Sequence, residues 1–249
     1  MRYPRDLAKG GTIGFPAPSF GCNIEPYRSA FDHALDRWQS MGYKTLPGPN
    51  CYVGEGVGIS NTPEKCGAEI MEMFCGQEAD VLISCGGGEL MCEILEYVDF
   101  PRLAEAEPKW FMGYSDNTNL VYPLVTLCDT AAVYGPCASA FGMEPWHASI
   151  DDAFKLLTGE KRVMENYPLW EKESLKNEEN PLEPYHVTEP LALKVFTEGQ
   201  LVEDPGKAGT ELRVTGRLLG GCMDCLVNLL GTRYDGTVAF CEKYREDGI

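Results

Sequence analysis

Ser115 is the residue of this 249-residue chain whose surroundings best suit nucleophilic chemistry. It lies in Gly113-Tyr-Ser-Asp-Asn-Thr118, between a run of bulky apolar residues and a helical pattern. A serine on such a turn projects its hydroxyl from the carboxyl edge of a sheet, and the free amide of the next residue, Asp116, can bind an oxyanion. The spacing differs from G-x-S-x-G, because Asn117 replaces the second glycine. The alternative is a helix N-cap formed by Ser115 or Asp116.

Three consecutive glycines, Gly86, Gly87 and Gly88, end a buried apolar run at residues 81–85 and precede a helical pattern. Without side chains, their backbone can approach a ligand closely, and their amides can hold an anion or an oxyanion. The run does not match the dinucleotide fingerprint G-x-G-x-x-G with its later acidic residue. We therefore expect no cofactor here. A tight turn without a ligand is the alternative.

Cys222-Met-Asp-Cys225 has the spacing of zinc and redox motifs. A structural zinc site needs four ligands, yet the chain has no second such pair, and the nearest other thiol is Cys241. Two small thiols on a helix face explain the motif better, so we expect no metal. The chain has eleven cysteines and no export signal, which predicts free thiols in a cytoplasmic protein.

Glu242 follows the apolar residues 238–241, which we predict to be a strand. A carboxylate at the end of a strand can orient a histidine that acts as general base, although a solvated strand end is the alternative. The histidines His33, His147 and His186 lie in a predicted helix, a loop and an acidic segment. None lies at a predicted strand end, so we expect none to reach Ser115.

Alternating strands and helices over residues 1–159 must position these groups. The pattern predicts right-handed crossovers and a mainly parallel, Rossmann-like sheet, with ligands at the carboxyl ends of its strands. Ser115 and the three glycines lie at two such ends. The predicted strands are 11–15, 42–47, 81–85, 110–114 and 131–134, and the predicted helices are 25–41, 62–76, 90–97, 117–127 and 151–157.

The pattern changes after residue 159. Residues 160–189 are rich in glutamate and proline and predict an acidic connector. Residues 190–249 predict a C-terminal α/β domain with strand-like segments at 191–196 and 211–219, a helix at 223–230 and the strand that precedes Glu242. Because the chain ends soon after that strand, we expect this second domain to be incomplete.

The composition excludes several classes of partner. Asp and Glu total 38 against 21 Lys and Arg, which gives a net charge of −17. Such a surface repels phosphate backbones and anionic lipid, so we expect neither a nucleic acid nor a membrane as partner. We also find no apolar run of the ~20 residues that a transmembrane helix needs.

Taken in order, these segments resemble the LD-carboxypeptidase family of serine peptidases, which includes murein tetrapeptide carboxypeptidases and microcin-immunity peptidases. The nucleophile segment at residues 109–118 is the most specific match. The long acidic connector resembles the microcin-immunity branch. Further segments that resemble the family are 11–19, 62–74, 81–88, 134–136, 216–221, 230–232 and 238–242.

The resemblance implies a Ser–Glu–His triad with Ser115 as nucleophile and Glu242 as the residue that orients the histidine. It implies oxyanion donors at the amides of Gly87 and Asp116, and substrate contacts at Gly86 and Gly88. The implied reaction is hydrolysis of an amide bond in a murein tetrapeptide or in a microcin-like peptidyl or aminoacyl nucleotide. The implied protein is a homodimer that uses no cofactor and no metal.

Two departures from the family pattern affect these expectations. Cys222 stands where family members usually carry asparagine. The family's histidine follows the glutamate by more residues than this sequence contains, so we expect this chain to lack the base, to be inactive and to expose apolar surface. A different class of protein, a non-catalytic α/β protein that binds a small molecule or an anion, is the alternative function.

Overall fold

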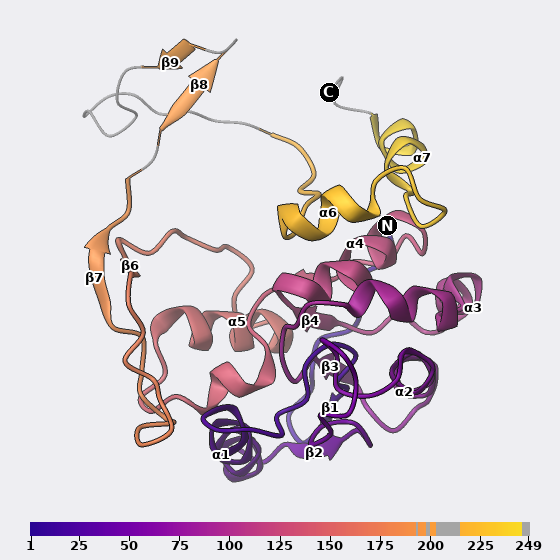
Figure 1. The fold of residues 1–249 in the computed structure, drawn as a ribbon. Helices are drawn as coiled ribbons and strands as arrows, with labels where there is room; N and C mark the ends of the chain where they lie inside the picture. The colour runs from indigo at the N-terminus through magenta and orange to yellow at the C-terminus, as the bar shows by residue number, and fades with distance from the viewer. Residues whose placement is uncertain (193, 198–199, 203–214, 246–249) are drawn as a thin grey trace.

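A computed structural model describes residues 1–192, 194–197, 200–202 and 215–245 of the protein (Figure 1). Five parallel strands form one sheet in the order β2-β1-β3-β4-β5. This arrangement confirms the predicted Rossmann-like, mainly parallel α/β fold. The strands are β1 (Thr12–Phe15), β2 (Lys44–Pro47), β3 (Val81–Ile83), β4 (Phe111–Gly113) and β5 (Val133–Tyr134).

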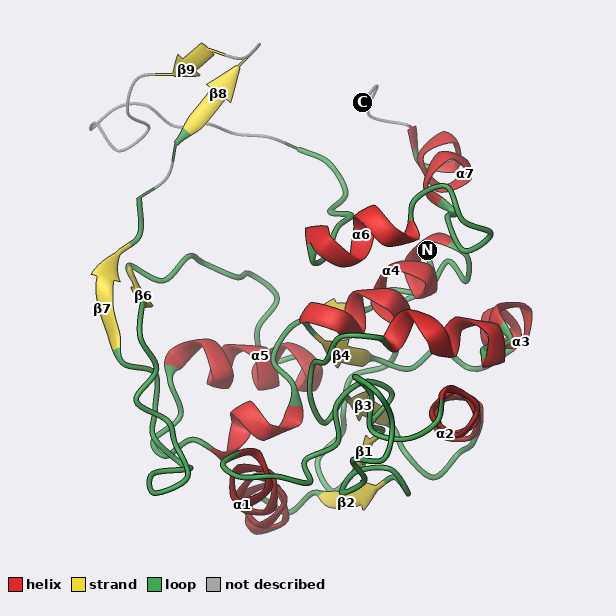
Figure 2. Ribbon diagram, viewed as in Figure 1, coloured by secondary structure: helices red, strands yellow, loops and turns green. Residues whose placement is uncertain are grey.

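Helices cover both faces of the sheet, as Figure 2 shows. Consecutive strand residues face opposite sides, so Ile83 packs into one apolar core and Leu82 into the other. The first core lies under α1 (Tyr27–Ser40), η3 (Ala138–Gly142) and α5 (Ala148–Thr158). The second lies under α2 (Pro63–Cys75), η1 (Met91–Tyr97), α3 (Phe100–Glu105) and α4 (Thr118–Thr126). The element at residues 90–97, predicted as a helix, is a 3₁₀ helix.

Local sequence explains where several of these helices begin and end. Thr62 caps α2 by accepting a hydrogen bond from the amide of Lys65, and Pro63 occupies the first helical position, where its missing N–H costs nothing. Gly159 ends α5 in the left-handed conformation, with φ of +78°. No described helix is both long and apolar enough to cross a membrane.

The predicted acidic connector and the segment directly after it contain more regular structure than their composition indicates. Strand β6 (Leu169–Glu171) pairs antiparallel with β7 (Val187–Pro190), and β8 (Val195–Thr197) pairs antiparallel with β9 (Gln200–Val202). The predicted strand at 191–196 therefore overlaps only the beginning of β8. Of the predicted strand at 211–219, residues 211–214 lie outside the described residues, and 215–219 form no strand.

Two helices form the end of the described chain, and both contact α4 (Figure 1). The first, α6 (Met223–Leu229), agrees with the predicted helix at 223–230. The second, α7 (Thr237–Lys243), contradicts the strand predicted before Glu242. Short apolar runs do not distinguish strand from helix, and here Phe240 packs on Tyr244 one helical turn later, with ring centroids 4.9 Å apart.

Candidate functional site

Ser115 lies on a strained turn at the carboxyl end of β4. Its φ of +58° is in the left-handed region, which non-glycine residues rarely adopt and which occurs most often at functional sites. The Ser115 amide donates a hydrogen bond of 3.0 Å to the hydroxyl of Tyr134, at the end of β5. The 3₁₀ turn η2 (Ser115–Asn117) and helix α4 follow directly. The Asp116 amide, in this first turn, has no partner within the helix and is free to bind an oxyanion.

The Asp116 side chain has a role that the sequence analysis did not predict. Its carboxylate is buried and accepts hydrogen bonds from the Ser19 hydroxyl at 2.6 Å, the Met91 amide at 2.9 Å and the Asn119 side-chain amide at 2.9 Å. Burial raises the pKa of Asp116, and the bonds from Ser19 and Met91 act in the opposite direction. Asp116 thus joins the loops that follow β1, β3 and β4.

Asn117 explains why the turn departs from G-x-S-x-G. Its side chain is fully buried, and its Nδ2 donates to the Gly86 carbonyl at 2.9 Å and to the Tyr114 carbonyl at 3.1 Å. A glycine at this position would remove both bonds. Asn117 therefore fixes the glycine run against the turn that carries Ser115.

The three glycines of residues 86–88 allow close approach at this edge of the sheet. A Cβ on Gly87 would lie 3.1 Å from the Ser115 Cβ and 3.5 Å from its Oγ. A Cβ on Gly88 would lie 2.4 Å from the Ser19 hydroxyl, and one on Gly86 would lie 3.0 Å from the Phe20 ring. The run is therefore packed beside the proposed nucleophile, which a simple tight turn does not require.

A pocket of about 340 Å³ opens beside Ser115. One side of it is aromatic, because the rings of Phe20 and Tyr27 pack edge to face with centroids 5.4 Å apart. Among the described residues, no group of three or more His, Cys, Asp and Glu side chains could hold a metal ion. The lining residues are Phe20, Ile24, Tyr27, Gly86, Gly87, Gly88, Glu89, Tyr114, Ser115 and Ser139.

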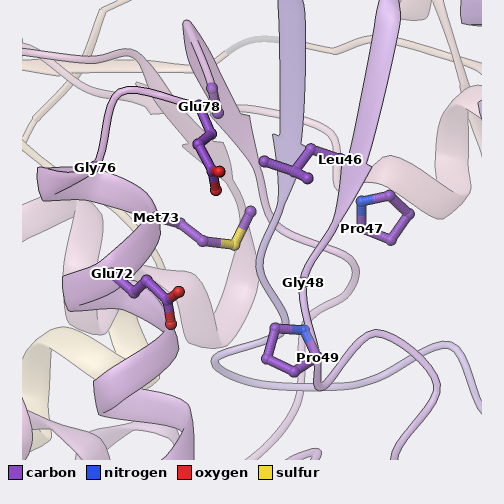
Figure 3. A pocket seen from close by; sticks show the side chains of 9 residues that line it. Leu46, Pro47, Gly48, Pro49, Glu72, Met73, Gly76 and Glu78 are labelled. Carbon is purple, nitrogen blue, oxygen red and sulfur yellow. The ribbon is translucent and has the colours of Figure 1, made fainter.

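A second pocket, of about 190 Å³, lies between the end of β2 and the end of α2 (Figure 3). The side chains of Glu72, Met73 and Glu78 line one side of it, opposite Leu46 and Pro47 (Figure 3). It contains none of the predicted site residues and no nucleophilic side chain. The pocket beside Ser115 is therefore the candidate site.

The three histidines occupy places that leave Ser115 without an imidazole. His33 Nδ1 lies 2.9 Å from the Gly142 carbonyl, and His147 caps α5 through Ser149. His186 is bound through its amide to Glu171. No hydrogen bond joins any of these rings to the Ser115 hydroxyl, although all three residues are described. The prediction that none reaches Ser115 is confirmed in this structure.

Glu242 lies on α7 rather than at the end of a strand, and its side chain is exposed. The residues that follow it, Lys243 and Tyr244, bind Asp129, in the loop after the C-terminal end of α4. Ser115 precedes the N-terminal end of the same helix, and Glu242 does not line its pocket. The structure therefore does not bring the two residues together, and the triad role of Glu242 stays a prediction.

Cys222 and Cys225 pack directly on the turn that carries Ser115. The Cys222 amide donates to the Thr118 hydroxyl at 2.8 Å, and the Cys225 thiol lies 3.6 Å from the Ser115 carbonyl. Burial raises the pKa of Cys225 to about 12, so this thiol stays protonated at neutral pH. All eleven cysteines are free, as predicted. No local pattern in the sequence predicts that the pair at 222–225 packs on the turn that carries Ser115.

Known proteins are similar to this chain in sequence. Residues 13–135 match the LD-carboxypeptidase N-terminal domain of the peptidase S66 family, and they include Ser115 and the glycine run. Over these residues the chain is similar to this family of peptidases. Among curated proteins, it is 25% identical to the microcin C7 self-immunity protein MccF of Escherichia coli over 252 aligned residues, which cover 96% of this chain and 68% of MccF.

Solved structures of related proteins share the fold. A variant of MccF in complex with adenosine monophosphate matches with a TM-score of 0.76 at 22% identity, over 93% of this chain and 66% of that one. An MccF-like protein from Streptococcus pneumoniae, also in complex with AMP, matches with a TM-score of 0.67 at 19% identity, over 94% and 67% of the two chains. The chain thus spans about two thirds of the length of these relatives.

Proposed function

We propose that this protein is a serine peptidase of the LD-carboxypeptidase type, which hydrolyses an amide bond in a small peptide-like substrate. The observation that carries the proposal is the position of Ser115. Its left-handed backbone holds it at the carboxyl end of β4, beside Gly87 and on the wall of a pocket. Strand-to-helix turns of this kind present the nucleophile of other serine hydrolases at the edge of a sheet.

In the proposed reaction, the Ser115 hydroxyl attacks the carbonyl carbon of the scissile amide. The amides of Gly87 and Asp116 stabilise the resulting oxyanion, and Gly86 and Gly88 contact the backbone of the substrate. A histidine takes the hydroxyl proton and returns it to the leaving amine, and Glu242 holds that imidazole in the correct tautomer. The histidine and the function of Glu242 rest on the family resemblance. The reaction uses no cofactor and no metal.

Two substrate classes fit the proposal, a murein tetrapeptide and a microcin-like peptidyl or aminoacyl nucleotide. One matched structure is MccF in complex with aspartyl sulfamoyl adenosine, which supports the second class. We further propose that the protein works as a homodimer in the cytoplasm.

The test is a turnover assay with both substrate classes, on the protein with its catalytic histidine present and on the Ser115→Ala variant of that protein. Loss of the nucleophile should reduce turnover by about four orders of magnitude or more. Ser174→Ala, in the exposed segment before β7, is the matched control and should leave turnover unchanged. A Ser115→Ala protein that keeps its turnover would show that the nucleophile is assigned wrongly.

A non-catalytic binding protein is the second candidate, and the position of the histidines favours it. No imidazole contacts the Ser115 hydroxyl, and a serine without a base is a poor nucleophile. This candidate predicts that both substrates bind without turnover and that Ser115→Ala leaves their affinity almost unchanged. Calorimetric binding beside the turnover assay distinguishes the two functions.

A further inference from the structure

The pocket beside Ser115 carries one acidic side chain, Glu89, and none of its lining residues is lysine, arginine or histidine. The remaining polar groups of its wall are backbone and the hydroxyls of tyrosine and serine. A phosphate or carboxylate beside Glu89 would meet a negative charge and no positively charged side chain. The electrostatics of the pocket therefore favour a cationic group.

Glu89 is held at this place by its backbone. It follows Gly88 directly, and its amide donates a hydrogen bond of 3.0 Å to the carbonyl of Gly58. Its side chain is exposed, and within the described residues its carboxylate forms no ion pair and no hydrogen bond. The fold thus fixes the backbone of Glu89 beside the glycine run and leaves its charge available to a ligand.

The charge of Glu89 acts on the nucleophile turn. The pKa of Asp116 is raised mainly by burial, and the negative charge of Glu89 adds to the same effect. Glu89 and Ser115 line the same pocket, so a cation bound at Glu89 would lie in the pocket that contains the reacting hydroxyl.

The other walls of the pocket suit an amine on a short carbon chain. Ile24, Tyr27 and Tyr114 line the pocket, and each residue is between 40% and 51% exposed. Phe20 packs against Tyr27. Aromatic faces attract ammonium groups, and the aliphatic wall contacts the carbons that carry them. Carboxylate and aromatic faces together provide a site for a primary ammonium.

We propose that Glu89 binds a primary ammonium group of the substrate close to the scissile carbonyl, so that the protein selects aminoacyl or peptidyl groups with a free amine. This inference rests on the proposed function, since it defines the substrate of the same pocket. Glu89 is a specificity-determining residue in this proposal and takes no part in bond cleavage.

The experiment compares two probes, alanyl sulfamoyl adenosine and its N-acetyl form, by calorimetry at pH 7. They differ in the charge of the amine and in the acetyl group that removes this charge, and the Glu89→Gln variant separates the two effects. The unchanged protein should bind the free amine about two- to five-fold more tightly, the upper part of the range for an exposed charge pair. Glu89→Gln should bind both probes equally. Glu93→Gln, an exposed glutamate outside the pocket, removes the same charge and should keep the preference.

Each outcome decides the inference. Equal binding of the two probes by the unchanged protein, or a preference that survives in Glu89→Gln, would overturn the role of Glu89 and leave the proposed function standing. If neither probe binds, this inference fails, and the turnover assay with a murein tetrapeptide decides the proposed function separately. The preference should also shrink between 0.05 and about 0.5 M salt, because salt screens exposed charges.

Discussion

The Ser19 hydroxyl donates a hydrogen bond of 2.6 Å to the carboxylate of Asp116, across 97 positions of sequence. Both side chains are buried. This bond joins the loop after β1 to the residue that follows the proposed nucleophile. It makes the shape of the pocket depend on the packing of β1 against its neighbours in the sheet.

Ser19→Ala should lower the free energy of unfolding by about 1.5–3 kcal/mol. The change removes a buried hydrogen bond to a carboxylate and leaves an acceptor unsatisfied. Urea denaturation measures the effect, with Ser174→Ala as a surface control that should stay within about 0.5 kcal/mol. If Ser19→Ala lowered the free energy of unfolding by less than about 0.5 kcal/mol, water or another donor would have to replace the hydroxyl.

The pKa of Asp116 predicts how stability depends on pH. Because burial raises its pKa in the folded state above the usual value of 3.8, the folded protein holds this proton more strongly than the unfolded chain. The contribution of Asp116 to stability is therefore fully present below pH 3.8 and is lost as pH rises through the raised pKa. The difference in unfolding free energy between the protein and Asp116→Asn should therefore fall as the pH rises from 3.8 through the raised pKa.

Asp152 provides a control of opposite sign for this measurement. Hydrogen bonds from Lys161 and Tyr167 lower its pKa, so its stabilising contribution is present above pH 3.8 and is lost as pH falls through the lowered pKa. The difference in unfolding free energy between the protein and Asp152→Asn should therefore rise with pH. If the two free-energy differences changed with pH in the same direction, the raised pKa of Asp116 would be contradicted.

Local features of the site could be predicted from sequence, and contacts between distant segments could not. Ser115 and Gly87 were predicted because strand, turn and helix signals lie within a few residues of each. The Asp116 network was missed, because Ser19 and Met91 reach it only through the order of the strands. The strand before Glu242 was predicted wrongly, since the four apolar residues 238–241 can form either element and packing against α4 decides between them.

Gly87→Ala should impair catalysis more than stability. Its Cβ would lie 3.1 Å from the Ser115 Cβ, so the nucleophile must shift by a few tenths of an ångström. A displaced nucleophile costs about 100-fold in turnover when the shift approaches 1 Å, so we expect a loss of about ten-fold or more. Gly220→Ala is the matched control, because nothing lies within 4 Å of its added methyl group. Equal turnover of the two variants would place Gly87 away from the reaction.

The strain at Ser115 predicts an unusual order of stabilities among its variants. At φ of +58°, a side chain costs about 1 kcal/mol relative to glycine, whereas at ordinary φ glycine is the less stable residue. Ser115→Gly should therefore be more stable than Ser115→Ala by about 1 kcal/mol in urea denaturation, although both lack the hydroxyl. Ser139→Gly and Ser139→Ala, in η3 on the same pocket, form the control pair and should show the reverse order. If Ser115→Ala were instead more stable than Ser115→Gly, the turn would be relaxed in solution. Ser115 would then lack the left-handed backbone that distinguishes it from a helix cap.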